Sequence, residues 1–187
     1  MSNDVDYLNN IISYQANTPF IYGCHNFYPQ VGTALPYDYF MKCNTRFKRF
    51  GIHSAAFVAS QVGKMGPWNV NDGLPTLEMD RRLPIEVQAK QLFATNMIDD
   101  VIIGNAYASE AELKALSQVN KYQLSFKINF VQDVNKIEKT IALNPQHFRR
   151  GDLNRMAIRS TMLRVYYKDH SNPAHDNEVS FQRCDVL

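Results

Sequence analysis

The sequence predicts an α/β protein whose strands run parallel. Three short apolar runs, "FIYGC", "AAFVA" and "DVIIG", are separated by stretches in which apolar residues recur at helical spacing. Such alternation is typical of βα units with right-handed crossovers. The runs are apolar on both faces, which indicates helices on both sides of a sheet or a packed barrel beneath it. A Rossmann-like sheet and part of a (β/α)8 barrel both stay open, although no Gly-x-Gly-x-x-Gly follows a strand.

The helical stretches follow one another in a regular order. Residues 4–16 carry apolar side chains at helical spacing, and residues 37–50 do so again, with Gly51 where a C-terminal glycine belongs. Residues 84–96 form the third stretch, which a proline opens. The run "SEAE" from residue 109 is a capping box, and it predicts the start of a fourth helix.

The pattern changes near residue 121. The run "QLSFKINFV" alternates apolar and polar residues, which predicts a half-exposed antiparallel strand. "MAIRSTMLRVYY" and "FQRCDVL" also read as strand regions. We therefore expect two domains, residues 1–120 with the helices and parallel strands and residues 121–187 with a small β structure.

Composition excludes several classes of protein. The chain has 187 residues, of which 45% are hydrophobic, and its net charge of +2 is scattered without a basic cluster. A nucleic-acid partner is therefore not expected. No stretch approaches the ~20 apolar residues that span a bilayer, and the start "MSNDVDYLNN" lacks a signal pattern. Three distant cysteines predict no disulfide framework and no zinc site, so we expect a cytoplasmic protein.

Polar residues follow the predicted strands directly. His25, Asn26 and Tyr28 come after the first strand, and Asn105 comes after the third. The carboxyl ends of parallel strands are where α/β proteins hold their sites, so these side chains are predicted to line a pocket. The alternative for His25 is a structural hydrogen bond to the backbone, and for this residue both readings stay open.

A loop of more than twenty residues follows the second strand, and loops of this length usually have a function. It contains the single tryptophan, Trp68, together with a charged cluster of Asp72, Glu78, Asp80, Arg81 and Arg82. An aromatic face can stack on a sugar ring, a carboxylate can serve as acid or base, and a guanidinium can bind phosphate. The simpler readings are that Glu78 is a favourable charge at a helix start and that Asp80 and Arg81 form a solvated ion pair of little energetic weight.

Four separate motifs resemble one known family. "CHNFYP", "FKRFGIHSAAFV", "GP" with "GLPTLE", and "IDDVIIGN" with its following "AS" and "EL" are similar, in order and spacing, to the MupG-like bacterial 6-phospho-N-acetylmuramidases. Many members of that family carry the older label "outer surface protein". A weaker similarity continues through "HFRRGDLNRMAIRSTMLR".

The resemblance implies a fold and an activity. The fold would be a TIM barrel followed by a small cyclophilin-like β domain, with "FIYGC", "AAFVA" and "DVIIG" as strands six to eight. The activity would be cleavage of MurNAc-6-phosphate from N-acetylglucosamine during peptidoglycan recycling, without a metal or organic cofactor. The partner would be a phosphorylated amino-sugar disaccharide. Because the similarity covers only the later part of the family, we expect a truncated chain with little hydrolase activity of its own.

The resemblance also implies site residues. Glu78 would contribute one of the two carboxyl groups that glycoside hydrolysis requires. The substrate-binding residues would be His25, Asn26, Tyr28, Trp68, Arg81, Asn105, Arg150, Asp152 and Arg159. The alternative function is a non-catalytic sugar-binding or interaction fragment, which would pair with a subunit that supplies the remaining strands or associate with itself through open strand edges.

Overall fold

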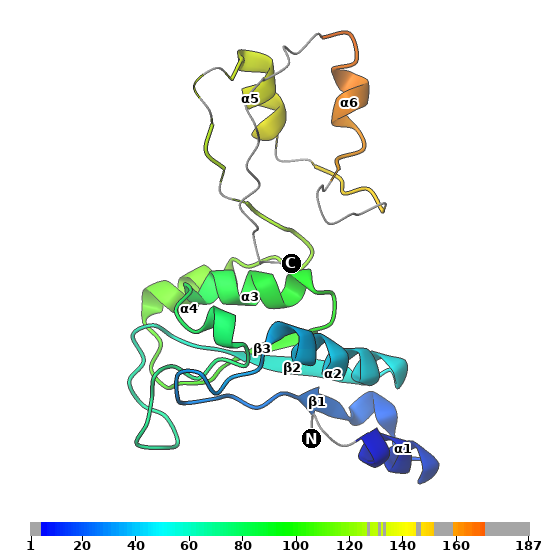
Figure 1. The fold of residues 1–187 in the computed structure, drawn as a ribbon, viewed down its shortest axis with the longest axis vertical. Helices are drawn as coiled ribbons and strands as arrows, with labels where there is room; N and C mark the ends of the chain where they lie inside the picture. The colour runs from blue at the N-terminus through cyan, green and yellow to red at the C-terminus, as the bar shows by residue number, and fades with distance from the viewer. Residues whose placement is uncertain are drawn as a thin grey trace. The chain divides into compact units, whose positions relative to one another are not determined.

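The computed structural model describes residues 5–126, 128–130, 132, 134–144, 147–151 and 159–170. The chain divides into two compact units, with the boundary between Ser125 and Phe126. The first unit alternates strands and helices (Figure 1). Its elements are α1 (Val5–Ser13), a 3-10 turn (Thr18–Phe20), β1 (Tyr22–Cys24), α2 (Tyr37–Arg49), β2 (His53–Val58), a 3-10 turn (Glu78–Asp80), α3 (Ile85–Ala94), β3 (Asp100–Ile103) and α4 (Glu110–Ser117).

The three strands form one parallel sheet in the order β1-β2-β3, as the alternating pattern predicts. Tyr22 lies opposite His53 in the first pair, and Ala55 lies opposite Asp100 in the second. The outer edges of β1 and β3 have no strand partner among the described residues. Within this part of the chain no helix combines the length and the hydrophobicity that a membrane crossing requires.

The core lies between the sheet and the helices that cover one of its faces. Phe40 of α2 and Leu92 of α3 are fully buried against Ala56 and Val58 of β2. The buried members of this cluster are Leu35, Phe40, Ala56, Val58, Leu77, Ile85, Ala89, Leu92 and Ile98. Their burial removes apolar area from water at about 25 cal/mol per Å², the main force that holds this layer together.

In the described residues the helices α2 and α3 pack on the face of the sheet that carries Ala56 and Val58. Of the two arrangements that the sequence left open, helices on both faces are not seen in this part of the chain. Successive side chains of a strand point to opposite faces. Tyr22 of β1 is 56% exposed and Ile102 of β3 is 41% exposed, on the face opposite Ala56 and Val58. The sequence predicted that this second face is apolar, but it did not predict which part of the chain, if any, packs on it.

The sequence patterns that predicted the ends of three helices are confirmed. Gly51 follows α2 with φ +63°, a left-handed conformation that glycine adopts readily. Ser109 caps α4 in a capping box, in which its side chain accepts from the Glu112 backbone N–H and Glu112 reaches back to Ser109. Pro84 precedes the first residue of α3 as its N-cap.

Gly104 predicts a large effect of a small substitution. A Cβ atom at this position would clash with the Leu74 carbonyl oxygen and would lie 2.8 Å from the Leu74 Cβ. Because one clashing atom is backbone, Gly104→Ala is expected to lower the free energy of unfolding by about 2–3 kcal/mol. Urea unfolding followed by circular dichroism measures this loss. Gly151→Ala is the control, since nothing lies within 4 Å of its added Cβ, and equal midpoints for the two variants would contradict the prediction.

The second unit contains α5 (Lys136–Ala142) and α6 (Leu163–Tyr166). Asn135 and Glu138 form a capping box at the start of α5, and an isolated antiparallel bridge joins Arg149 to Ser160. The strand expected at "QLSFKINFV" (residues 123–131) is not formed in the described residues 123–126 and 128–130, because no second segment pairs with their backbone groups there. The expected strand in "MAIRSTMLRVYY" is partly replaced by α6, and "FQRCDVL" lies outside the described residues.

Candidate functional site

The segments that follow β1, β2 and β3 meet at the carboxyl edge of the sheet. The β1 segment is held to the β2 segment by a hydrogen bond from the Tyr28 N–H to the Pro75 carbonyl, 3.2 Å long. The β2 segment is held to the β3 segment through Asn105, which is 2% exposed. Its Oδ1 accepts from the Ser60 N–H, and its Nδ2 donates to the Ser60 and Gly63 carbonyls, all at 2.8 Å. Asn105 therefore shapes the loop after β2.

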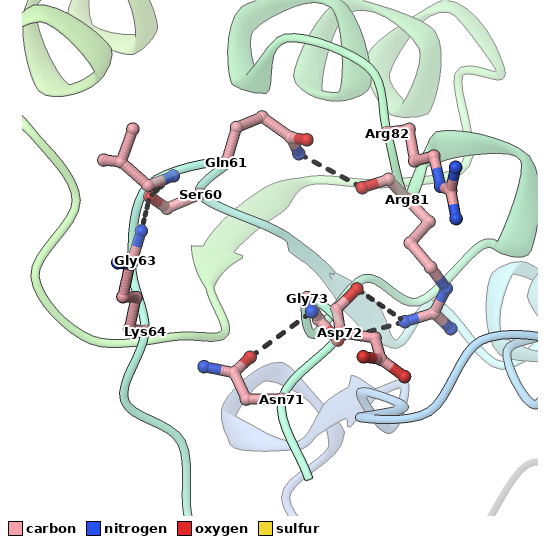
Figure 2. A pocket seen from close by; sticks show the side chains of 10 residues that line it. Ser60, Gln61, Gly63, Lys64, Asn71, Asp72, Gly73, Arg81 and Arg82 are labelled. Carbon is pink, nitrogen blue, oxygen red and sulfur yellow. Dashed lines mark hydrogen bonds between the residues drawn. The ribbon is translucent and has the colours of Figure 1, made fainter.

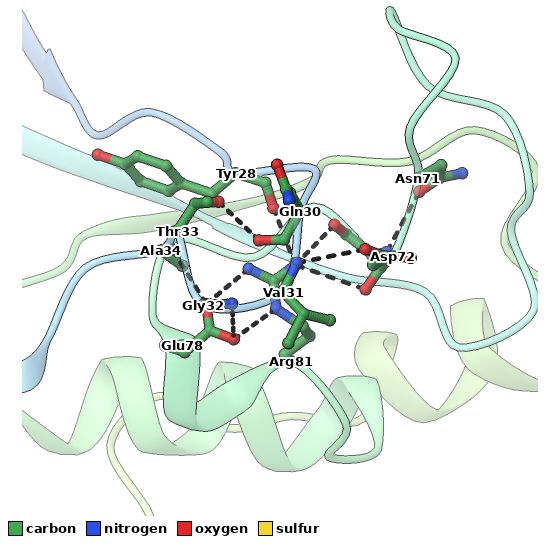
Figure 3. Close-up of polar contacts among 11 residues, drawn as sticks. Tyr28, Gln30, Val31, Gly32, Thr33, Ala34, Asn71, Asp72, Glu78 and Arg81 are labelled. Atoms are coloured by element: carbon green, nitrogen blue, oxygen red, sulfur yellow. Dashed lines mark hydrogen bonds and ion pairs between the residues drawn. The ribbon is translucent and has the colours of Figure 1, made fainter.

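Arg81 is the centre of the polar network at this edge (Figure 3). Its Nε and Nη2 atoms donate to the two carboxylate oxygens of Glu78, at 2.8 and 2.7 Å. Its Nη1 atom donates to the carbonyls of Tyr28 at 2.9 Å and Gly73 at 3.0 Å. The Arg81 side chain is 3% exposed. A guanidinium whose donors are committed in this way braces two loops and has little left for a ligand.

Glu78 is held as a carboxylate. Besides Arg81, the backbone N–H groups of Gly32 and Ala34 donate to it, at 2.9 and 3.0 Å. The hydrogen bonds from Arg81 and from these backbone groups lower the pKa of Glu78 to about 2. A group with so low a pKa is a poor proton donor at neutral pH. The geometry favours a structural role, and the catalytic role of Glu78 stays a prediction.

Asp80 has the opposite electrostatic character, two residues further on. Its side chain is fully buried, and neither carboxyl oxygen has a hydrogen-bond partner among the described residues. Burial raises the pKa of Asp80 to about 7. Such a pKa suits a general acid. Asp80 does not line the cavity described below, however, so we assign it no contact with a ligand.

His25 packs against residues of α2. It is 2% exposed, its Nε2 lies 3.0 Å from the Asn44 Oδ1, and its ring packs against Phe40 and Phe47 with centroids 4.9 and 5.7 Å away. Burial lowers the pKa of His25, which favours the neutral imidazole. These contacts favour a structural role, although the partner is the Asn44 side chain and not the backbone carbonyl of the expected alternative, and the binding role of His25 stays a prediction.

The aromatic residues of the rim are more accessible. Trp68 is 58% exposed, and its ring lies 5.4 Å from the ring of Phe27, which in turn lies 5.0 Å from Phe57 of β2. Asn26, directly before Phe27, is exposed. An exposed indole that packs on one ring, which itself packs on a strand residue, is an apolar platform beside polar groups. Of the predicted binding residues in the first unit, Asn26 and Trp68 are thus the two that solvent reaches most freely.

A cavity of about 240 Å³ opens beside the network (Figure 2). It is lined by Ser60, Gln61, Val62, Gly63, Lys64, Asn71, Asp72, Gly73, Arg81 and Arg82. Sequence reasoning predicted only Arg81 of this set. The sequence shows two consecutive arginines, but it does not show which one is buried. The 3-10 turn Glu78–Asp80 places the guanidinium of Arg81 inside and leaves that of Arg82 exposed. Lys64 reaches the cavity only because of the fold of the loop after β2, and no local sequence pattern predicts that fold.

The predicted residues of the second unit are only partly described. The Arg150 N–H donates to the Arg159 carbonyl at 2.9 Å, beside the bridge between Arg149 and Ser160. Asp152 lies outside the described residues. In the described part of the chain no group of three His, Cys, Asp or Glu side chains is arranged as metal ligands would be.

The fold and this edge together define an α/β protein with a polar, partly cationic site at the carboxyl ends of parallel strands. The chain belongs to the 6-phospho-N-acetylmuramidase family. The family model for the N-terminal part, MupG_N, matches residues 1–118, and the model for the C-terminal part, MupG_C, matches residues 124–187. The resemblance in the sequence motifs is thereby confirmed.

Two solved structures are similar to the chain. An uncharacterized protein of B. cereus is 56% identical, with a TM-score of 0.81 over 94% of this chain and 50% of its own. A conserved protein of unknown function from a locus in Enterococcus faecalis is 26% identical, with a TM-score of 0.54 over 64% of this chain and 32% of its own. The chain thus spans half the length of the first and about a third of the second. Among the curated proteins, none matches the chain.

Proposed function

We propose that the chain binds a phosphorylated amino-sugar disaccharide and takes part in the cleavage of MurNAc-6-phosphate from N-acetylglucosamine. The match of both family models, over residues 1–118 and 124–187, carries this proposal. The proposal places the reaction in the cytoplasm, during the recovery of peptidoglycan fragments. It also treats β1, β2 and β3 as consecutive strands of a (β/α)8 barrel, and residues 121–187 as part of a cyclophilin-like domain.

The rim supports sugar binding more directly than it supports catalysis. Trp68 and Phe27 offer an apolar platform, and the Asn26 side chain is an exposed donor and acceptor beside it. Cleavage of a glycoside uses two carboxyl groups, one of which must hold a proton. In the described residues Glu78 has a pKa of about 2, and Asp80, whose pKa is near 7, is fully buried. We therefore assign this chain recognition first and propose that its own turnover is slow.

The proposal is tested by measuring both the binding and the cleavage of one disaccharide by the purified chain. Calorimetric titration of the purified chain with MurNAc-6-phosphate-N-acetylglucosamine is expected to show saturable binding, and mass spectrometry of the mixture is expected to show little released MurNAc-6-phosphate. Rapid cleavage would refute the assignment of slow turnover. Absence of binding at millimolar substrate would refute the proposed function itself.

Trp68→Ala is expected to weaken this binding about tenfold, because the loss of one aromatic stacking surface costs about 1–1.5 kcal/mol. Phe20→Ala is the matched control, since Phe20 is 80% exposed and precedes β1, at the opposite end of the strand from the site. Equal affinities of the two variants would show that the platform does not bind the sugar.

A further inference from the structure

The cavity in Figure 2 has the chemistry of an anion site. Apart from two glycines, Val62 is the only apolar residue that lines it. A volume of about 240 Å³ is below the range of about 300–1,000 Å³ that is usual for drug-sized ligands. The cavity therefore suits a single small polar group and not a whole disaccharide.

Two cations of the lining are free to bind a ligand. Lys64 follows β2 and Arg82 precedes α3, so they enter from different segments (Figure 2). Both side chains are exposed, and neither makes a hydrogen bond or ion pair with another described residue. Arg81 also lines the cavity, but its charge is offset by Glu78. Arg81 is therefore a structural residue, whereas Arg82, with no ion-pair partner among the described residues, has its charge available for a ligand.

A third donor supports the same reading. The Asn71 Oδ1 accepts from the Gly73 N–H at 3.3 Å, which fixes the orientation of the amide. The Nδ2 atom of the same side chain is buried and has no partner among the described residues. An unsatisfied buried N–H donor costs about 1–3 kcal/mol, so a ligand that accepts from it is favoured.

One carboxylate opposes the cations. Asp72 lines the cavity, and its Oδ2 accepts from the Val31 N–H at 3.3 Å. With Arg81 paired to Glu78, two cations face one carboxylate, and the remaining balance is positive. This hydrogen bond holds the Oδ2 atom of Asp72 toward the loop after β1 (Figure 3).

We propose that this cavity, with Lys64, Arg82 and the Asn71 amide as its donors, binds a phosphate monoester dianion. Within the proposed function, on which this part of the inference rests, the bound group is the phosphate of the amino sugar. Lys64 supplies a point charge, and Arg82 supplies a planar pair of donors that matches two phosphate oxygens. The cavity then makes the chain prefer the phosphorylated sugar over the unphosphorylated one.

Inorganic phosphate is the first probe, because its binding does not depend on the sugar. Titration of the ¹⁵N-labelled chain is expected to shift the Gly63 amide and the Asn71 side-chain amide signals in a saturable way. Lys64→Gln with Arg82→Gln is expected to weaken the affinity about tenfold or more. Lys42→Ala with Arg49→Ala removes the same charge from the exposed surface of α2 and should leave the affinity within about twofold.

Asp72→Asn separates an electrostatic role from a structural one. Removal of the opposing carboxylate is expected to tighten phosphate binding about threefold or more, whereas damage to the cavity could only weaken it. Shifts confined to other amides, or unchanged affinity in the Lys64 and Arg82 double variant, would overturn the anion site.

Titrations with phosphorylated and unphosphorylated sugars distinguish the failure of this inference from the failure of the proposed function. Calorimetry compares MurNAc-6-phosphate with N-acetylmuramic acid in the wild type and in the double variant. A preference for the phosphorylated sugar that disappears in the double variant supports both. Phosphate binding at the cavity without binding of either sugar keeps the anion site and refutes the proposed function. Sugar binding that is insensitive to the phosphate, in both proteins, refutes the phosphate subsite alone.

Discussion

Arg81→Met is expected to lower the free energy of unfolding by about 3 kcal/mol. The substitution keeps the length of the side chain but removes the donors to both Glu78 oxygens and to the carbonyls of Tyr28 and Gly73. Removal of one member of a buried pair costs about 3–5 kcal/mol. The Glu78 side chain is 32% exposed, so water recovers part of its charge and the expected loss lies at the lower end.

A double-mutant cycle measures the coupling. Glu78→Gln leaves the buried Arg81 charge without its partner and is expected to cost about as much as Arg81→Met. The double variant should lose clearly less than the sum of the two single variants. Arg82→Met is the matched control, since this exposed neighbour should change stability by less than about 0.5 kcal/mol. Additive losses would show that the two side chains act independently.

The pair also predicts acid sensitivity. The folded pKa of Glu78, about 2, lies below its ordinary value, so the stabilisation is fully present above about pH 4.5. It is lost as the pH falls toward 2. The wild type should therefore lose more stability than Glu78→Gln between pH 5 and pH 3, by about 1 kcal/mol after allowance for the exposure of Glu78.

The second large effect concerns Asp80→Asn, which is expected to flatten the pH dependence of stability. Below about pH 4 Asp80 is protonated in both states and ionisation costs nothing. Between pH 4 and pH 7 the unfolded chain ionises while the folded chain, with a pKa of about 7, keeps its proton. The wild type therefore loses stability as the pH rises through this window, by about 4 kcal/mol in total. Above pH 7 the loss is complete.

Denaturant titrations at pH 4, 6 and 8 measure this effect. The difference in unfolding free energy between Asp80→Asn and the wild type should shift in favour of the variant by about 4 kcal/mol from pH 4 to pH 8. Asp38→Asn replaces an exposed carboxylate in the first turn of α2, and its difference from the wild type should vary by less than about 1 kcal/mol. A constant offset for Asp80→Asn would mean that the buried carboxyl does not titrate as described.

Sequence periodicity predicted the first unit well because its elements follow local rules. The three apolar runs became parallel strands, and the glycine after α2 and the capping box of α4 mark helix ends through their own backbone geometry. The second unit was predicted less well. Alternation in "QLSFKINFV" indicates which face of a strand would be apolar, but a strand also requires a partner that local sequence does not specify.

The site was only partly predictable for a similar reason. The sequence places His25, Tyr28 and Asn105 after strands, yet it does not say whether a side chain turns toward solvent or under a helix. His25 pairs with Asn44, nineteen positions later, and that contact could not be read from the residues around His25. Arg81 and Arg82 have the same local chemistry, and only the turn Glu78–Asp80 distinguishes the buried one from the exposed one.

The bracing by Arg81 and Glu78 also bears on the order in which the molecule folds. Their hydrogen bonds reach Tyr28 and Gly32, which are 53 and 46 positions away along the chain. Contacts of such separation form late, because the entropy of closing the intervening chain must first be offset by strand pairing. The loops at the carboxyl edge therefore become ordered only after β1 and β2 have met. In a folding experiment, recovery of ligand binding should lag behind the recovery of helical signal.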